Sequence, residues 1–263
     1  MKNKNIFINA DDFGRSEVIS NNIIKTIESG MINSVSVMVD EKKEIYEKLN
    51  KLNIKKKLHI NLTDYNPNRI FQEDEMILKK LTFMKLLLLK KKNRSVVFKE
   101  IDRQIDQYVK FFREEKILID GHQHIHVIPW IYNYLLNQKN YIIKEIRLPK
   151  EEFFFGDIKA FLKLKFYRNL LAFVILNTLV SFFLKDKKYS PPYSGMIYSG
   201  MYNEKIFTNN YKFMKNKYDS FEIAFHPGFT NLKEDDQFYN IFFKYYSSEE
   251  RKKEFNLAMK KLI

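Results

Sequence analysis

The chain has five histidines and no cysteine. Each histidine lies in or directly after an apolar run that predicts a strand, and they are His59, His122, His124, His126 and His226. Imidazole binds divalent metals and exchanges protons near neutral pH. Without a thiolate, any metal must bind His, Asp or Glu. A disulfide framework, a thiolate zinc site and a cysteine nucleophile are therefore excluded.

Three of these histidines alternate with other residues in the stretch His122-Gln123-His124-Ile125-His126. If this stretch is extended, its alternate side chains point to one face, so three imidazoles could line one wall of a pocket. That spacing is typical of metal or proton chemistry. The alternative is a polar loop with structural histidines.

Two adjacent aspartates, Asp11 and Asp12, follow the short apolar run Lys4 to Ala10. Burying unpaired carboxylates is costly, and a divalent cation would supply the missing charge. Neighbouring side chains on a strand point in opposite directions, so one carboxylate could bind a metal while the other addresses a bound water. The alternative is that one of them caps the following helix.

Three further residues have weaker local signals. His226 precedes Pro227-Gly228 and could act as a general acid or orient a carboxylate, or it could simply brace a turn. Arg147 could pair with a carboxylate in the site or lie on the surface. Trp130, the single tryptophan, could stack on a sugar ring or belong to the core. The chain lacks the glycine-rich motifs of nucleotide-binding folds and the Gly-x-Ser-x-Gly elbow of serine hydrolases.

The apolar pattern alternates between strands and helices. Strands are predicted at Lys4 to Ala10, Ser34 to Val39, Leu58 to Leu62, Ile117 to Ile119, Glu145 to Leu148 and Phe221 to Phe225. A helix is predicted from Ser16 to Ser29, and another carries Ile101, Ile105, Tyr108 and Phe112 on one face. This alternation predicts parallel βαβ units in one α/β domain over residues 1–263, arranged as a deformed, TIM-barrel-like (β/α) barrel. Its polar strand ends would then converge on one rim.

Composition narrows the range of partners. The 263 residues carry 46 Lys and Arg against 32 Asp and Glu, a net charge of +14. The basic residues are mostly Lys spread along the chain, so we interpret them as compositional bias and expect no nucleic-acid partner. The apolar run near the start is too short for a signal peptide, which predicts a cytoplasmic location. Leu170 to Leu184 is shorter than the roughly 20 residues of a membrane span, so we expect a buried or interfacial helix there.

Seven blocks of sequence, in this order, resemble the YdjC-like carbohydrate deacetylases, which include chitooligosaccharide deacetylases. The blocks are INADDFG (8–14), SVSVMV (34–39), LHINLT (58–63), IDGHQHIHVIP (119–129), IRLP (146–149), SGMIYSG (194–200) and FHPGF (225–229). The ADDFG and DGHQHIH blocks are the most specific. One departure is Lys57, where the family often has glycine two residues before its first metal-binding histidine.

The resemblance implies a hydrolase that binds one divalent metal and removes the N-acetyl group from an amino sugar or oligosaccharide. By motif position, the metal ligands would be Asp12, His59 and His122, and the general base would be Asp11. The same comparison makes His226 the general acid or transition-state stabiliser and Arg147 a supporting residue. The same comparison assigns His124 and His126 to the substrate side or to positions behind the ligands. We add Trp130 to this set because its aromatic ring could stack on a sugar. The donor set suits magnesium or zinc, and manganese and cobalt remain alternatives.

Other interpretations stay open at this stage. The chain could be another metal-dependent C–N or ester hydrolase on the same barrel. It could instead bind glycans or a membrane surface without catalysis, because residues 84–94 and 163–188 combine apolar and basic side chains. Peripheral contact with the inner face of the membrane and a homodimer are two further hypotheses.

Overall fold

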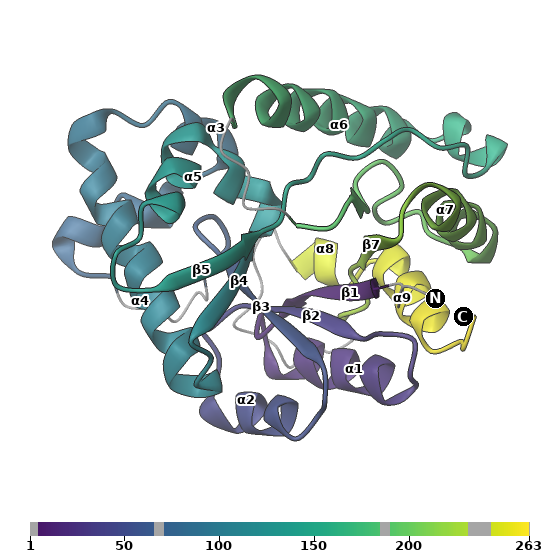
Figure 1. Cartoon of the computed structure of the whole chain (residues 1–263), viewed down its shortest axis with the longest axis horizontal. Coiled ribbons are helices and arrows are strands. Elements are labelled where there is room, and N and C mark those ends of the chain that lie inside the picture. The colour runs from purple at the N-terminus through teal and green to yellow at the C-terminus, as the bar shows by residue number, and fades with distance from the viewer. Residues whose placement is uncertain (1–4, 66–70, 185–189, 231–242, 263) are drawn as a thin grey trace.

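A parallel β-sheet of seven strands, curled into an open half-barrel, organises the chain in the computed structural model (Figure 1). The structure describes residues 5–65, 71–184, 190–230 and 243–262. The strands are β1 Asn5–Phe13, β2 Ser34–Val37, β3 Lys55–Ile60, β4 Lys116–Gly121, β5 Ile142–Ile146, β6 Tyr193–Ser194 and β7 Ser220–Phe225. Their order in the sheet is β5-β4-β3-β2-β1-β7-β6, and every pairing in the described residues is parallel. The expected deformed (β/α) barrel is confirmed.

Helices connect successive strands and cover the outside of the sheet (Figure 1). The α-helices are α1 Glu17–Glu28, α2 Lys43–Asn50, α3 Phe83–Leu87, α4 Arg94–Phe112, α5 Pro129–Leu136, α6 Leu164–Phe183, α7 Glu204–Lys217, α8 Phe243–Tyr246 and α9 Glu249–Ala258. Short 3₁₀ helices are η1 Glu73–Glu75, η2 Leu78–Lys80, η3 Lys91–Asn93, η4 His122–Val127 and η5 Ile158–Leu162. As predicted, α4 buries Ile101, Ile105, Tyr108 and Phe112.

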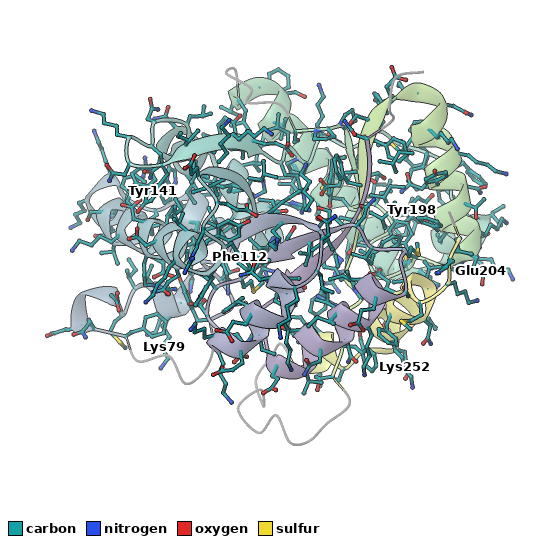
Figure 2. All side chains as sticks on the ribbon, turned by 60° about the horizontal axis from the view of Figure 1, so that its bottom comes forward. Lys79, Phe112, Tyr141, Tyr198, Glu204 and Lys252 are labelled. Carbon is teal, nitrogen blue, oxygen red and sulfur yellow. The ribbon has the colours of Figure 1, made fainter. Side chains whose placement is uncertain are left out.

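Side chains fill the space between the sheet and its helices (Figure 2). The labelled Lys79, Glu204 and Lys252 project from the exposed surface instead. The two-residue strand β6 was not predicted, because Tyr193 and Ser194 are too short a run to show alternation. The start of β3 was also missed, since Lys55 to Lys57 read as polar.

The end of β1 departs from a regular strand, and this departure positions both aspartates. β1 extends through Asp11 and Asp12 to Phe13, and its pairing with β2 shifts register between Ala10 and Phe13. Asp12 has φ 71°, a left-handed conformation that costs energy for a residue other than glycine. The bulge interrupts the simple alternation expected for the two carboxylates. Such irregularities are common next to active sites because they re-aim a side chain.

Ser16, and neither aspartate, caps α1. The Ser16 hydroxyl accepts a hydrogen bond from the backbone N–H of Ile19. The alternative of helix capping by Asp11 or Asp12 is therefore wrong. Gly14 turns the chain between β1 and α1 with φ 82°, and a Cβ added there would lie 2.0 Å from the carbonyl oxygen of Met38. Only glycine fits this turn.

The histidine-rich stretch is not extended. Residues 122–127 form the 3₁₀ helix η4, and Gln123 and His124 inside it have left-handed backbone angles. Successive histidines therefore point in different directions, and the expected wall of three imidazoles is wrong. A two-residue alternation holds only on a strand, and β4 already ends at Gly121.

α6 is longer and more exposed than expected. It runs from Leu164 to Phe183, and of the described helices it alone is long and apolar enough to cross a membrane by length and composition. Only 22% of its most apolar window is buried in the structure. A buried core helix is therefore the wrong interpretation of this segment. The basic residues Lys185, Lys187 and Lys188 that follow it lie outside the described residues.

Candidate active site

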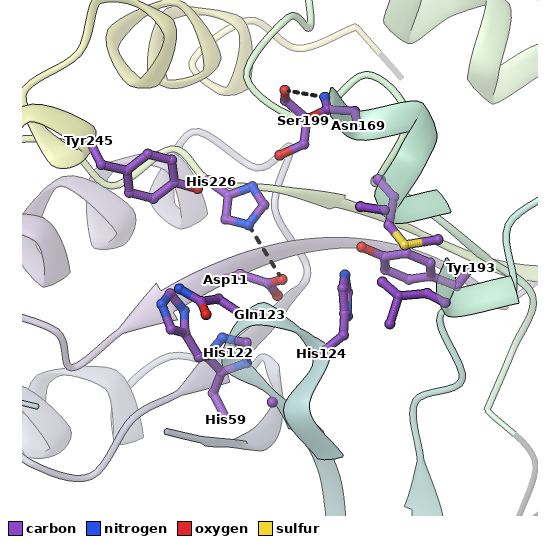
Figure 3. Close-up of a pocket in the computed structure, with 15 residues that line it drawn as sticks. Asp11, His59, His122, Gln123, His124, Asn169, Tyr193, Ser199, His226 and Tyr245 are labelled. Atoms are coloured by element: carbon purple, nitrogen blue, oxygen red, sulfur yellow. Dashed lines mark hydrogen bonds and ion pairs between the residues drawn. The ribbon is translucent and has the colours of Figure 1, made fainter. Parts of the chain in front are cut away.

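The carboxyl ends of the parallel strands bring together side chains that are far apart in the sequence. Asp11 and Asp12 come from β1, His59 from β3, and His122 from the segment directly after β4. Arg147 follows β5, and His226 follows β7. This rim is where parallel α/β folds assemble their chemistry. It encloses a cavity of about 180 Å³ that is lined by Asp11, His59, His122, His124 and His226, with Tyr193 and Tyr245 (Figure 3).

One carboxylate and two imidazoles form a group that fits a divalent metal. Asp12 Oδ1 lies 3.1 Å from His122 Nδ1 and 3.5 Å from His59 Nε2. The three side chains are buried, and one ligand atom from each lies within 4.8 Å of the others. Two nitrogen donors and one oxygen donor match the ligand set of zinc, and the same set with water serves other divalent metals.

Asp120 orients His59 from behind. Its Oδ1 lies 2.6 Å from His59 Nδ1, which leaves Nε2 directed at Asp12. Metal-binding histidines usually donate from the second nitrogen to a carboxylate, a backbone carbonyl or a water, and Asp120 is such a carboxylate. Burial opposes the charged form of His59, but Asp120 and Asp12 outweigh it and raise its pKa to about 10. Metal binding through Nε2 therefore requires His59 to release a proton.

A second possible metal group, Asp11, His59 and Asp120, shares one histidine with the first. Its carboxylates already have partners, because Asp120 holds His59 Nδ1 and Asp11 accepts two hydrogen bonds from Arg147. In the first group, Arg251 occupies only Oδ2 of Asp12, so that Oδ1 remains directed at both His122 and His59. Asp12, His59 and His122 are therefore the stronger candidate set of metal ligands, and we call them the metal group.

Asp11 is held as a carboxylate beside the metal group. Arg147 donates one hydrogen bond from each terminal nitrogen to the two oxygens of Asp11, and both bonds are 3.0 Å long. Asn9 donates a third hydrogen bond, of 2.6 Å, to Asp11 Oδ1. Burial raises the pKa of Asp11, but the Arg147 guanidinium and the nearby His59 and His226 together outweigh burial, so the pKa is lowered. His226 lies across the cavity with Nε2 3.9 Å from Asp11 Oδ2 (Figure 3).

Arg147 and Lys57 belong to a buried charge network behind the site. Arg147 also contacts Asp120 Oδ2 at 2.8 Å and Glu222 Oε1 at 2.5 Å. Lys57 forms a buried ion pair with Glu222. Lys57, the residue that departs from the family pattern, thus neutralises a carboxylate in the barrel interior.

His124 and His126 occupy different places. His124 lines the cavity and packs edge-on against Tyr193, and burial lowers its pKa well below the usual range. His126 lies behind the site, where its Nε2 donates to the carbonyl oxygen of Arg147 over 2.7 Å. Burial lowers the pKa of His126 to about 4, so this imidazole is neutral at physiological pH.

A family model with the description "YdjC-like protein" matches residues 5–261. The chain belongs to this family. The resemblance of its motifs is thereby confirmed, and the match spans every residue of the candidate site.

Two named relatives match parts of this YdjC-like chain at low sequence identity. It is 24% identical to a carbohydrate deacetylase of Mus musculus over 157 residues, covering 56% of this chain and 51% of the relative. It is 25% identical to a carbohydrate deacetylase of Danio rerio over 133 residues, covering 47% of this chain and 42% of the relative. The matches therefore span about half the length of these relatives.

One solved structure shares the fold. A protein of Enterococcus faecalis V583, described as a candidate cellobiose-phosphate cleavage protein, superposes with a TM-score of 0.59. The superposition covers 98% of this chain and 96% of that one, at 17% sequence identity. At this identity, the likeness concerns the fold alone.

Trp130 does not line the cavity of the YdjC-like chain. It lies at the start of α5, where its indole N–H donates to the carbonyl oxygen of Leu86 over 3.1 Å. Its ring packs against Phe98 and under the Arg94 guanidinium. We therefore propose no role in substrate binding for it.

Several residues around the site were not assigned from the sequence. Asp120 lies within the DGHQHIH block and could have been found there, since a carboxylate beside a metal-binding histidine is common. Arg251 and Tyr245 come from the C-terminal helices, whose sequence has no motif. Arg251 donates to Asp12 Oδ2 over 2.7 Å, and Tyr245 lines the cavity. Only the fold brings them to the site.

Proposed function

We propose that this YdjC-like chain is a metal-dependent hydrolase that removes the N-acetyl group from an N-acetylated amino sugar or oligosaccharide. One observation carries the proposal. His59 and His122 of the metal group line the same cavity as a carboxylate, Asp11, whose ionised form is held by Arg147. The names of the deacetylase relatives support the acetylated sugar as substrate class.

An amide is a poor electrophile, so hydrolysis needs an activated water, a stabilised oxyanion and a protonated leaving amine. A bound divalent cation would lower the pKa of a water molecule and polarise the acetyl oxygen. Asp12, His59 and His122 would hold it, and zinc, magnesium, manganese and cobalt all accept these donors.

Asp11 accepts the proton of the attacking water. Its carboxylate is ionised because Arg147 lowers its pKa, and its Oδ2 faces His226 across the cavity. Arg147 acts as a positioning residue, since two parallel hydrogen bonds fix the plane of the carboxylate.

His226 performs the second proton transfer. Burial and the nearby Arg251 lower its pKa, so the ring is neutral before reaction. The proton taken up by Asp11 passes to His226, which gives it to the departing nitrogen as the C–N bond breaks. The products are acetate and the free amino sugar.

Acetate release tests this proposal. Metal-stripped protein is reloaded with zinc, magnesium, manganese or cobalt and incubated with N,N′-diacetylchitobiose, N-acetylhexosamines and acetylated sugar esters. We expect metal-dependent release from at least one acetamido sugar, with Asp11→Asn reducing the rate by about 10²- to 10⁴-fold. Release from esters alone would replace the proposal with ester hydrolysis. Tight binding of the panel without release would replace it with non-catalytic glycan binding.

A further inference from the structure

The two faces of α6 have different surroundings, although both are apolar. The inner face buries Phe166, Leu176 and Val180. Asn169 donates to the carbonyl oxygens of Ile197 and Ser199, and Asn177 donates to that of Glu151. These contacts fix the inner face to the body of the protein.

The outer face of α6 presents large apolar side chains to solvent. Exposed side chains recur at helical spacing as Leu164, Tyr167, Leu171, Val174, Ile175 and Phe182, with Phe183 beside them. Segment 153–183 supplies more than half of the large exposed apolar side chains in the described part of the chain. In Figure 1 this helix runs along the top edge of the molecule. Contiguous exposed apolar surface of this kind marks an interaction site.

The charges around this face favour an anionic partner. Residues 158–184 contain no Asp or Glu, and their charged residues are Lys159, Lys163, Lys165 and Arg168. Lys163 and Arg168 are exposed beside Leu162 and Leu164, which are 87% and 77% exposed. A second copy of a chain with net charge +14 would be repelled, whereas anionic lipid headgroups would be attracted.

α3 also combines exposed apolar side chains with basic ones. Met84 and Leu88 are exposed, and Lys80 and Lys85 lie with them around a shallow groove. α3 and α6 both contact η4, the segment that carries His122. Both apolar-basic segments therefore adjoin the side of the molecule where the site lies.

The inner face of α6 also lines the catalytic cavity, through Asn169, Ala172 and Leu176. A second cavity of about 560 Å³ shares Asn169, Ala172, Ser199 and Tyr245 with it and reaches Leu164, Lys165, Arg168 and Glu250, so that two basic side chains and one acidic side chain line its outer end. The site is thus continuous with the basic end of the exposed face.

We propose that the outer face of α6 lies on the surface of an anionic lipid bilayer and presents the cavity to acetamido sugars carried on lipids. Apolar side chains would enter the boundary between headgroups and acyl chains, with the basic residues at the headgroups. The helix lies on the bilayer and does not span it, because Asn169, Asn177 and the cavity-lining residues hold its inner face to the protein. The lipid-borne substrate rests on the proposed deacetylase function, whereas the docking surface does not.

Vesicle flotation tests the docking surface. The full chain is mixed at low salt with phosphatidylcholine vesicles containing 30% phosphatidylglycerol, or none, and centrifuged through a density gradient. We expect wild type to float with the anionic vesicles, and Leu171→Glu/Val174→Glu to reduce the floated fraction about tenfold or more. These side chains are 63% and 52% exposed, so the double variant should fold.

A matched control places the same charges elsewhere. Ile142 and Met259 are 59% and 42% exposed on β5 and after α9, and Ile142→Glu/Met259→Glu should float as wild type does. Equal loss in this control, or wild type remaining at the bottom with anionic vesicles, would overturn the proposal. So would a wild-type dimer that Leu171→Glu/Val174→Glu converts to monomer, because a second copy would then cover α6.

The substrate is tested separately. Acetate release is measured from N,N′-diacetylchitobiose in solution and from an N-acetylglucosaminyl glycolipid in the anionic vesicles. Leu171→Glu/Val174→Glu should keep the first activity and lose about tenfold of the second. Equal activity of this variant on the glycolipid would overturn the lipid-borne substrate. Flotation without acetate release from any substrate would leave the docking surface standing and contradict the deacetylase function.

Discussion

Arg251 donates a hydrogen bond of 2.7 Å to Asp12 Oδ2, while Oδ1 of the same carboxylate lies 3.1 Å from His122 Nδ1. The C-terminal helix α9 thus holds a residue from the first strand with its Oδ1 directed at His122. Arg251 also lies 3.5 Å and 3.4 Å from the carbonyl oxygens of His226 and Gly228. One buried guanidinium therefore ties α9 to the ends of β1 and β7.

Arg251→Gln should destabilise the metal-free protein by about 3 kcal/mol, because removing one partner leaves the buried Asp12 carboxylate without its countercharge. A divalent metal would restore that countercharge, so it should stabilise the variant more than the wild type. Urea unfolding with and without zinc measures both effects. Equal stabilisation of both proteins by zinc would show that Asp12 is not a ligand.

Asp120→Asn should weaken metal binding about 10- to 100-fold while the fold is retained, because asparagine does not fix the His59 imidazole as the carboxylate does. Competition with a chelating dye measures the affinity. Asp106→Asn removes a carboxylate from the exposed side of α4 and provides the control. Unchanged affinity in Asp120→Asn would argue that His59 is not a ligand.

Lys57→Met should cost about 3 kcal/mol of unfolding free energy, because it leaves Glu222 with less countercharge in the interior. Adding Glu222→Gln should recover much of that loss, since residue 222 then no longer carries the negative charge that Lys57 compensated. Urea unfolding of the single and double variants forms a double-mutant cycle. Additive losses would mean that the two residues are not energetically coupled.

His126 should make the protein less stable in mild acid. Its folded pKa of about 4 lies below the ordinary value of 6.5, so the unfolded chain takes up a proton first as the pH falls. This contribution is fully present above pH 6.5 and is lost between pH 6.5 and about 4, by about 3 kcal/mol.

The comparison for this prediction is His126→Gln, whose amide N–H can still donate to the Arg147 carbonyl. The difference in unfolding free energy between the two proteins is measured at several pH values. We expect it to narrow or reverse from pH 7 to pH 4.5. A constant difference would contradict a neutral buried His126.

Periodic features were predicted well from the sequence. The inner face of α4 and the parallel strands follow from spacing that local structure enforces, and the polar ends of β1, β3 and β7 showed where the rim would be. The direction of the η4 histidines could not be predicted, because it depends on the left-handed turns at Gln123 and His124. The exposure of the outer face of α6 could not be predicted from the sequence either. An apolar helix looks the same in sequence whether protein or lipid covers it.

In the proposed function, Asp12, His59 and His122 hold one divalent metal while Asp11 transfers the proton of the attacking water. The most direct test measures bound metal and acetate release on the same preparations of wild type, Asp11→Asn and His122→Gln. We predict one metal per chain in wild type and in Asp11→Asn, acetate release from wild type alone, and loss of metal in His122→Gln. Full activity of Asp11→Asn, or equal wild-type activity after the metal has been removed, would contradict the account.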